Sequence, residues 1–174
     1  MKTLVIAEHN GEQLSATTLS VVDAAKKLGR EIDLLVASNS SSNILEEAKA
    51  VEGVTTVLDF SHEKFKNEIA EDIAACVVSV KDSYDFFLAS SSTSGKNNLP
   101  RAAALMDIQQ ISEVTEILDD KTFKKPIYAG SCIATVQSSQ EKNALTIRTT
   151  SFEKANNSGG SASIESKDVP ETQS

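Results

Sequence analysis

The sequence predicts an α/β fold of the Rossmann-like type: a mainly parallel sheet covered by helices on both faces, with antiparallel strands added near the C-terminus. Short runs of aliphatic residues alternate with segments of helical periodicity, and the connections between them are only a few residues long. The 174 residues are 40% hydrophobic but only 5% aromatic, and Trp is absent. This composition favours small aliphatic helices packed on a sheet over an aromatic-rich sandwich.

The first half of the chain reads as strand and helix in strict alternation. Residues 3–8 predict a buried strand because Leu4 to Ala7 are apolar without a break. Ser15 is a candidate N-cap for the first helix, and Gly29 is placed to end it. Further strands are expected at 32–37, 54–58 and 84–89, with helices beginning near 43 and, capped by Ser61, near 62. Such alternation implies right-handed crossovers and a parallel sheet.

The pattern changes beyond a helix expected to begin near Pro100 and to end near Ile108. No helical segment separates the later strand-like stretches, so they are predicted to add antiparallel strands to one edge of the sheet. These stretches are 111–117, 127–137 and 144–152.

Residues 153–174 consist mostly of Ser, Gly, Asn, Lys and Glu. Ile164 and Val169 are the only large aliphatic residues there, too few to drive folding. The sequence therefore predicts one α/β domain at 1–152, followed by a flexible tail or linker at 153–174.

Charge excludes several classes of partner. The formal net charge is −8 and the pI is near 4.8, and no basic run is interleaved with aromatic residues, so a nucleic acid is not an expected partner. No apolar run approaches the roughly 20 residues that cross a bilayer, so direct membrane insertion is not expected either. The first residues lead directly into a strand, which leaves no room for a signal or transit peptide.

The loop after the strand Tyr84–Ala89 is the strongest candidate for a binding site. It reads SSSTSGK, and small residues at a strand end let backbone N–H groups approach a phosphate. It is not a P-loop, because Ser90 stands at the first Gly position and Asn97 follows the lysine. The candidate nucleotide-binding residues are Ser92, Thr93, Gly95 and Lys96. The alternative interpretation is that the loop is small only because it turns tightly.

Other chemistry-bearing residues form no constellation. His9 and His62 are not spaced as a metal pair, and the GxSxG motif of serine hydrolases is absent. Cys76 and Cys132 lie in apolar runs and are expected to be buried, reduced thiols. A carboxylate neighbour, on this chain or a partner, is expected for Arg101 in the first helical turn and for Arg148.

Several blocks carry a resemblance to a known family. They are LVIAEHNG and SATTLSVVDAAKKLG near the start, GKNNLPRAAALMDI at 95–108, IYAGSCIATVQSS followed by LTIRTTSF at 127–152, and GGSASIE near the end. In this order they resemble the first domain of the alpha subunit of electron transfer flavoproteins. The second domain of that subunit, with its glycine-rich FAD-binding sequence, has no counterpart here. The resemblance therefore implies a truncated chain, a split gene or a remnant.

The resemblance also implies a function. The assembled flavoprotein is an alpha–beta heterodimer with one FAD, which takes electrons from dehydrogenases such as acyl-CoA dehydrogenases and passes them to a membrane quinone reductase. In many members the beta subunit holds a structural AMP. The present segment would be a scaffold and subunit interface without catalysis, in the bacterial cytoplasm or, as a mature chain, in the mitochondrial matrix. The alternatives are a free-standing adenine-nucleotide-binding module that uses the loop from Ser90 to Lys96 and an adenine-nucleotide hydrolase.

Overall fold

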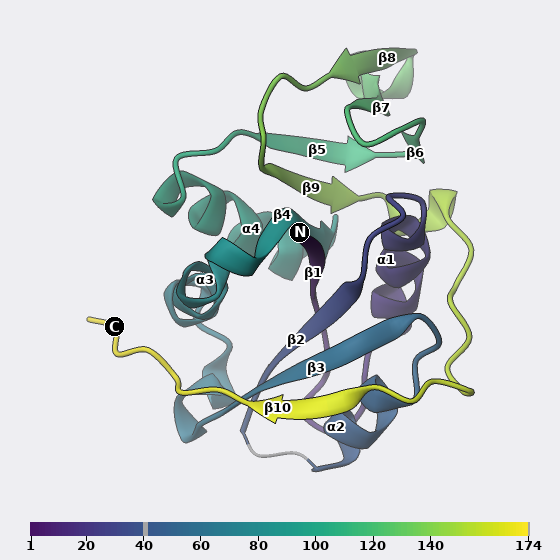
Figure 1. The fold of residues 1–174 in the computed structure, drawn as a ribbon. Coiled ribbons are helices and arrows are strands. Elements are labelled where there is room, and N and C mark those ends of the chain that lie inside the picture. Colours follow the sequence, from purple (N-terminus) through teal and green to yellow (C-terminus); the bar gives the residue numbers. More distant parts are fainter. Residues whose placement is uncertain (40–41, 174) are drawn as a thin grey trace.

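A seven-stranded sheet forms the centre of the computed structural model, which describes residues 1–39 and 42–173 (Figure 1). The strand order is β10-β3-β2-β1-β4-β9-β5, and every neighbouring pair is parallel. The strands are β1 (Lys2–Ile6), β2 (Ile32–Ser38), β3 (Val54–Ser61), β4 (Tyr84–Ser90), β5 (Gln110–Val114), β9 (Asn143–Ile147) and β10 (Ser163–Ser166). The mainly parallel sheet predicted from the alternating pattern is confirmed.

Helices cover both faces of this sheet, also as predicted. The helices α1 (Ala16–Lys26) and α2 (Ser42–Lys49) pack on one face through an aliphatic cluster that includes Val22 and Ile44. The helices α3 (Ala70–Ser79) and α4 (Thr93–Leu105) pack on the other face, where Val77 and Leu99 are fully buried. In Figure 1 these two pairs lie on opposite sides of β1 and β2.

Antiparallel strands are present near the C-terminus as predicted, but not all of the late strands are antiparallel. Both β5 and β9 join the main sheet, but parallel to their neighbours and not antiparallel. The antiparallel strands are β6 (Glu116–Ile117), β7 (Thr122–Ile127) and β8 (Cys132–Gln137), which form a separate sheet of their own. This small sheet projects beyond β5 (Figure 1) and is held to the core by Phe123, whose ring packs edge-on against Phe86 at 6.5 Å.

The helix expected to start near residue 62 is split in two. Its apolar stripe is present, but residues Glu63–Asn67 form a 3₁₀ turn, η1, and α3 begins only at Ala70. Glu68 lies between them with φ of +46°, a left-handed conformation that no α-helix can contain. The cap is also different, because His62 and not Ser61 accepts the N–H of Lys64. Three further 3₁₀ turns are η2 (Lys81–Ser83), η3 (Tyr128–Gly130) and η4 (Thr149–Ser151).

The composition of residues 153–174 predicts a flexible tail, but the structure places most of this segment on the domain surface. Ser163–Ser166 pair with β3 as the edge strand β10. The backbone N–H of Gly160 donates to Ala50, and Ala162 is buried. The prediction considered only the small number of apolar side chains, but backbone hydrogen bonds hold the segment to the domain. Residue 174, like residues 40 and 41 of the Ser-rich loop, lies outside the described residues.

Candidate functional site

The candidate site is the crevice at the carboxyl ends of β1 and β4. From β1 the chain passes through α1 to β2 on one side, and from β3 it passes through α3 to β4 on the other side. The order of strands therefore reverses at β1, and ligands in open α/β sheets bind at such a reversal. The loop after β1 and the loop after β4 form the two walls.

The predicted loop after β4 is mostly helix. Ser92 is the N-cap of α4 and accepts the N–H of Gly95 at 3.1 Å, so Thr93, Gly95 and Lys96 already lie in the first turns. The helix thus begins well before Pro100, because a serine cap starts it, and Pro100 lies inside the helix without a hydrogen bond to the carbonyl of Lys96.

Three of the four predicted residues have structural roles: Ser92 caps α4, and Gly95 and Lys96 make close contacts. Gly95 lets α4 lie close to the end of β4, since a Cβ there would stand 1.8 Å from the carbonyl oxygen of Ser90. The ammonium of Lys96 points to β5 and pairs with Glu113 at 2.7 Å. Thr93 is exposed. Ser92, Thr93 and Gly95 lie close together only because they form the first turn of α4, so their proximity is not evidence of a binding site.

Glu8 occupies the crevice itself. Its carboxylate accepts hydrogen bonds from the hydroxyls of Ser90 and Ser92, and from Thr17 Oγ1 at 3.2 Å. Thr17 lies in the first turn of α1, and Ser92 caps α4. One carboxylate therefore faces the N-termini of two helices, where backbone dipoles stabilise a negative charge.

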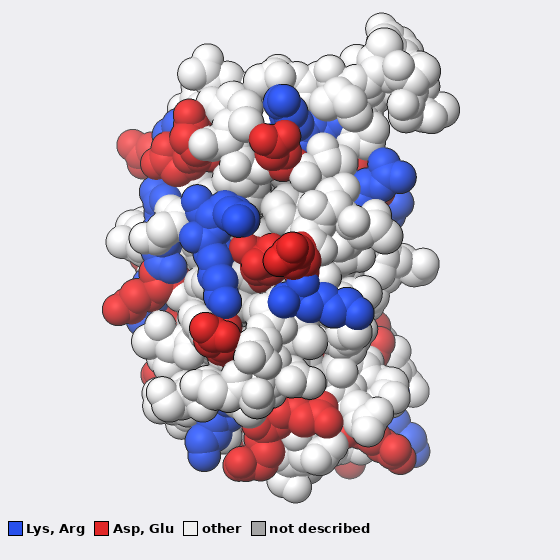
Figure 2. All heavy atoms as spheres, turned by 90° about the vertical axis from the view of Figure 1, so that its right-hand side faces the viewer, with Lys and Arg blue, Asp and Glu red and all other residues white. Residues whose placement is uncertain are grey.

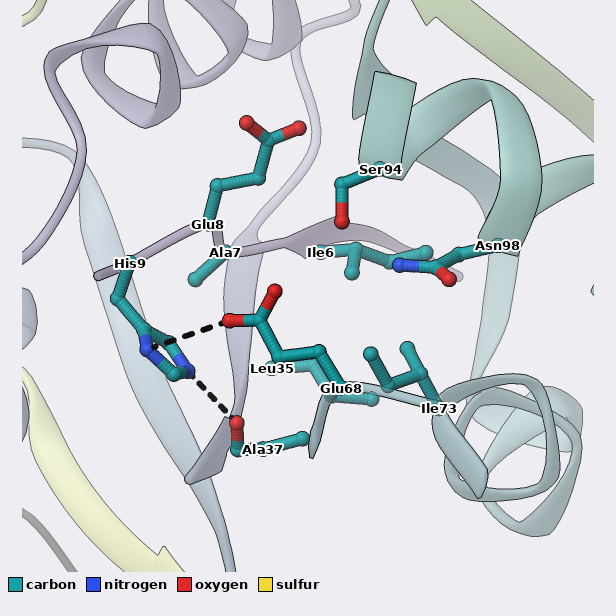
Figure 3. Close-up of a pocket in the computed structure, with 10 residues that line it drawn as sticks. All are labelled: Ile6, Ala7, Glu8, His9, Leu35, Ala37, Glu68, Ile73, Ser94 and Asn98. Atoms are coloured by element: carbon teal, nitrogen blue, oxygen red, sulfur yellow. Dashed lines mark hydrogen bonds and ion pairs between the residues drawn. The ribbon is translucent and has the colours of Figure 1, made fainter. Parts of the chain in front are cut away.

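His9 fills the neighbouring space at the end of β2. Its Nε2 lies 2.7 Å from the carbonyl oxygen of Ala37, and its Nδ1 accepts the N–H of Gly11 at 3.1 Å. A carbonyl can only accept, so the proton is on Nε2 and the imidazole is neutral in this arrangement. The carboxylate of Glu68 is 3.9 Å from Nδ1 (Figure 3) and can form an ion pair only if Nδ1 is protonated, which would break the bond from Gly11.

Little room remains behind these side chains. An inner cavity of about 80 Å³ lies against α4, where Ser94 and Asn98 face β1 across it (Figure 3). The side chain of Asn98 is 95% buried, since its exposed fraction is 5%, and its amide makes no hydrogen bond to any described residue. A wider, open depression of about 580 Å³ lies outside, and His9 and Glu68 line both spaces.

The other predicted residues lie away from this crevice. Cys76 is buried as expected, but Cys132 is exposed, because the small antiparallel sheet that carries it stands clear of the core. The carboxylate expected beside Arg101 is Glu71, at 3.3 Å. No ion pair joins Arg148 to another described residue. Within residues 1–39 and 42–173, no three His, Cys, Asp or Glu side chains are grouped to hold a metal ion.

Sequence reasoning did not identify Glu8 as part of the site and considered His9 only as a metal ligand. A signal was available: both are polar residues directly after a buried strand, where the carboxyl ends of parallel strands meet.

Comparison with known proteins shows the family. The family model described as "Electron transfer flavoprotein domain" matches residues 3–172. The chain belongs to the electron transfer flavoprotein family. It is 45% identical over 170 residues to the electron transfer flavoprotein subunit alpha of Pseudomonas aeruginosa, covering 98% of this chain and 55% of that protein. It is 42% identical to the mitochondrial alpha subunit of Dictyostelium discoideum, covering 92% of this chain and 48% of that protein.

The matches to electron transfer flavoprotein alpha subunits show how much of the alpha subunit this chain corresponds to. The chain spans about half the length of the curated relatives it matches, and a further relative, from Bradyrhizobium diazoefficiens, is 39% identical over 52% of its length. Likeness to an N-terminal domain of the alpha subunit is therefore confirmed. No helix among the described residues is long and apolar enough to span a membrane.

Proposed function

We propose that this domain is the scaffold and subunit interface of a heterodimeric, FAD-containing electron carrier. The carrier takes electrons from dehydrogenases such as acyl-CoA dehydrogenases and passes them to a quinone reductase. We place it in the bacterial cytoplasm or in the mitochondrial matrix, because one relative is bacterial and another is named mitochondrial. The domain itself performs no catalytic step. Its family membership and the surface of the small sheet support this proposal.

The surface of the β6–β7–β8 sheet is the observation that carries the interface role. Residues 126–140, PIYAGSCIATVQSSQ, contain no charged residue in a chain that is 24% charged. Tyr128 is 78% exposed and Ile133 is 59% exposed. Figure 2 shows an uncharged lobe at the top of the molecule, the level at which β8 lies in Figure 1. An exposed aromatic and an exposed aliphatic side chain in an uncharged patch are typical of a protein–protein contact.

The partner we propose for this surface is the beta subunit, because the relatives are named alpha subunits. Their names imply a second, different subunit, and a patch without charge fits a stable partner better than a transient one. The dehydrogenases and the quinone reductase would then be met by the assembled carrier.

The residues of this domain do not fit an FAD or an AMP. Glu8 places a carboxylate where a phosphate would have to lie, at the start of both α1 and α4. We therefore assign the FAD to parts of the assembled carrier outside this chain, and any AMP to the beta subunit. The same geometry supports the scaffold over the alternative of a free-standing adenine-nucleotide module.

Binding to the beta subunit from the same organism tests the interface. We expect the purified chain to form a one-to-one complex with it in size-exclusion chromatography with light scattering. Tyr128→Asn and Ile133→Thr should each weaken the complex by roughly tenfold or more, because exposed aromatic and aliphatic anchors dominate interfaces. Both side chains are exposed, so the melting temperature should stay within about 2 °C of the unchanged chain.

Leu105→Ser is the matched control. Leu105 is 61% exposed at the end of α4, outside the small sheet, and its loss should leave the affinity unchanged. If Leu105→Ser weakens the complex as much as Ile133→Thr does, or if no complex forms, the interface proposal is wrong.

A further inference from the structure

We propose that Glu8 and His9 act as an intramolecular plug that occupies the ligand crevice of this fold with groups of the chain itself. Glu8 stands in the place of an anion and His9 in the place of a flat heterocycle. The inference goes beyond the scaffold role and does not depend on it, because it concerns only how this domain closes its own crevice. We call these two side chains the Glu8–His9 plug.

The carboxylate half of the plug satisfies the groups that would bind an anion. The hydroxyl of Ser92 accepts the N–H of Gly95 and donates to Glu8, so it links the carboxylate to the start of α4. Thr17 links the same carboxylate to the start of α1. A bound phosphate would use these hydroxyls and helix termini, but it cannot approach them while Glu8 is ionised and in place.

The imidazole half closes the path inward. The ring of His9 is 94% buried, since its side chain has an exposed fraction of 6%, and it is fixed at both nitrogens by Ala37 and Gly11. It lines both the open depression of about 580 Å³ and the inner cavity of about 80 Å³, as Glu68 does, so the ring lies where the two spaces adjoin.

The inner cavity has both polar and apolar walls. The amide of Asn98 is 95% buried, faces the cavity and makes no hydrogen bond to the described part of the chain. The amide is thus a polar group of the cavity wall, open to whatever fills the cavity. The cavity is polar on this wall and apolar at Ile6 and Ile73, as a pocket for a heterocycle would be.

Chemical rescue tests the plug with one small molecule for each half. Glu8→Ala removes the carboxylate and leaves room for formate, and His9→Gly removes the ring and leaves room for imidazole. We expect each variant of the full chain to melt roughly 5 °C below the unchanged protein. Formate should raise the melting temperature of Glu8→Ala by at least half of that loss, saturably, relative to sodium chloride at equal ionic strength. Imidazole should do the same for His9→Gly.

The two variants are controls for each other. Formate should not rescue His9→Gly, imidazole should not rescue Glu8→Ala, and neither should stabilise the unchanged protein. Glu141→Ala removes an exposed carboxylate in the turn before β9 and should respond to neither molecule.

Equal effects of formate and chloride on Glu8→Ala, or rescue without regard to which molecule is added, would overturn the proposal. So would calorimetric binding of AMP to the unchanged protein. If Glu8→Ala does not fold in chloride, refolding in formate decides: recovery supports the plug and failure opposes it. Glu8→Gln, which keeps the shape but not the charge, should melt lower and stay unresponsive to formate, and a rescue there would contradict site-specific replacement.

Discussion

Burial controls the ionisation of two side chains in the core. It is the main cause that raises the pKa of the Cys76 thiol from 9.0 to about 12; the Lys64 ammonium opposes this shift and Asp72 adds to it. Burial likewise raises the pKa of the Tyr84 phenol, and the hydrogen bond of 2.6 Å that it donates to Asp33 raises it further. Both groups are therefore held in the neutral form by the fold.

These shifts predict a loss of stability in alkali. Each raised pKa contributes stability that is complete below the unfolded pKa and is lost as the pH rises toward the folded value. For Cys76 the loss begins near pH 9 and continues to about pH 12, with a slope of about 1.4 kcal/mol per pH unit. Urea unfolding between pH 8 and 10 should show this fall in the free energy of unfolding.

Cys76→Ala is the control for the alkaline fall. The variant should be less stable throughout because it leaves a cavity, but its free energy of unfolding should fall less steeply between pH 9 and 10. Identical slopes for the variant and the unchanged protein would show that Cys76 is not the titrating group.

Cys132 shows why residue-level prediction succeeded for one cysteine and failed for the other. Both lie in apolar runs, and that pattern alone predicts burial for both. Cys76 lies on the inner face of α3, whereas Cys132 begins β8, in a sheet whose outer surface no described residue covers. An apolar run predicts that a surface is shielded from water, but it does not predict whether the same domain or a partner protein covers that surface.

At the scale of elements, α4 depends on a glycine for its position. A Cβ at Gly95 would stand 1.8 Å from the carbonyl oxygen of Ser90, a backbone atom that cannot turn aside. In an ordinary helix interior, Gly→Ala stabilises by about 1 kcal/mol. Here we expect Gly95→Ala to destabilise the domain by about 2 kcal/mol or more, because the helix must move away from β4.

Asn97→Ala provides the comparison within the same helix. Asn97 is exposed two residues further on, so its replacement should stabilise slightly through helix propensity. Thermal or urea unfolding of both variants measures whether each substitution raises or lowers the free energy of unfolding. A stabilising Gly95→Ala would mean that α4 does not lie as close to β4 as described here.

The element boundaries that sequence reasoning missed share a physical cause. The apolar stripe from Phe65 to Val80 predicts one helix, but Glu68 adopts φ of +46° and divides it. Pro100 suggests a helix start, yet Ser92 provides the cap that sets the true start. Ser15, by contrast, caps α1 as predicted, with its hydroxyl accepting the N–H of Thr17. Local patterns fix which residues face the core, while tertiary contacts decide where each turn of helix begins.

At the scale of the whole molecule, the parallel topology could be predicted because short connections leave few arrangements. The crevice could also be placed, since it follows from the strand order. Its content could not: nothing in the spacing of Glu8 and His9 says that the carboxylate reaches Ser92 or that the ring reaches Ala37. Those contacts need the relative positions of three separate segments, at the ends of β1, β2 and β4.

The C-terminal segment gives the sharpest test at this scale. It crosses the domain from α2 to α3: Ala162 is buried, the N–H of Lys167 donates to Asp59 at 2.9 Å, and Val169 packs on the α3–α4 side. At its end the Lys64 ammonium donates to the carbonyl of Pro170 at 2.7 Å. These contacts describe a strap that closes the edge of the sheet at β3.

Removing residues 158–174 should therefore destabilise the domain by about 2 kcal/mol, from the apolar surface of Ala162 and Val169 and the loss of the edge strand. Removing only residues 173 and 174 should change nothing, because the last hydrogen bond of the strap among the described residues is the one that the Thr172 hydroxyl donates to Asp72. Urea unfolding of both shortened chains measures the difference. If both deletions are equally harmless, residues 153–174 are a flexible linker, as their composition predicts. If only the longer deletion lowers the stability, the segment is anchored to the domain, and any chain that continued beyond it would start beside α3.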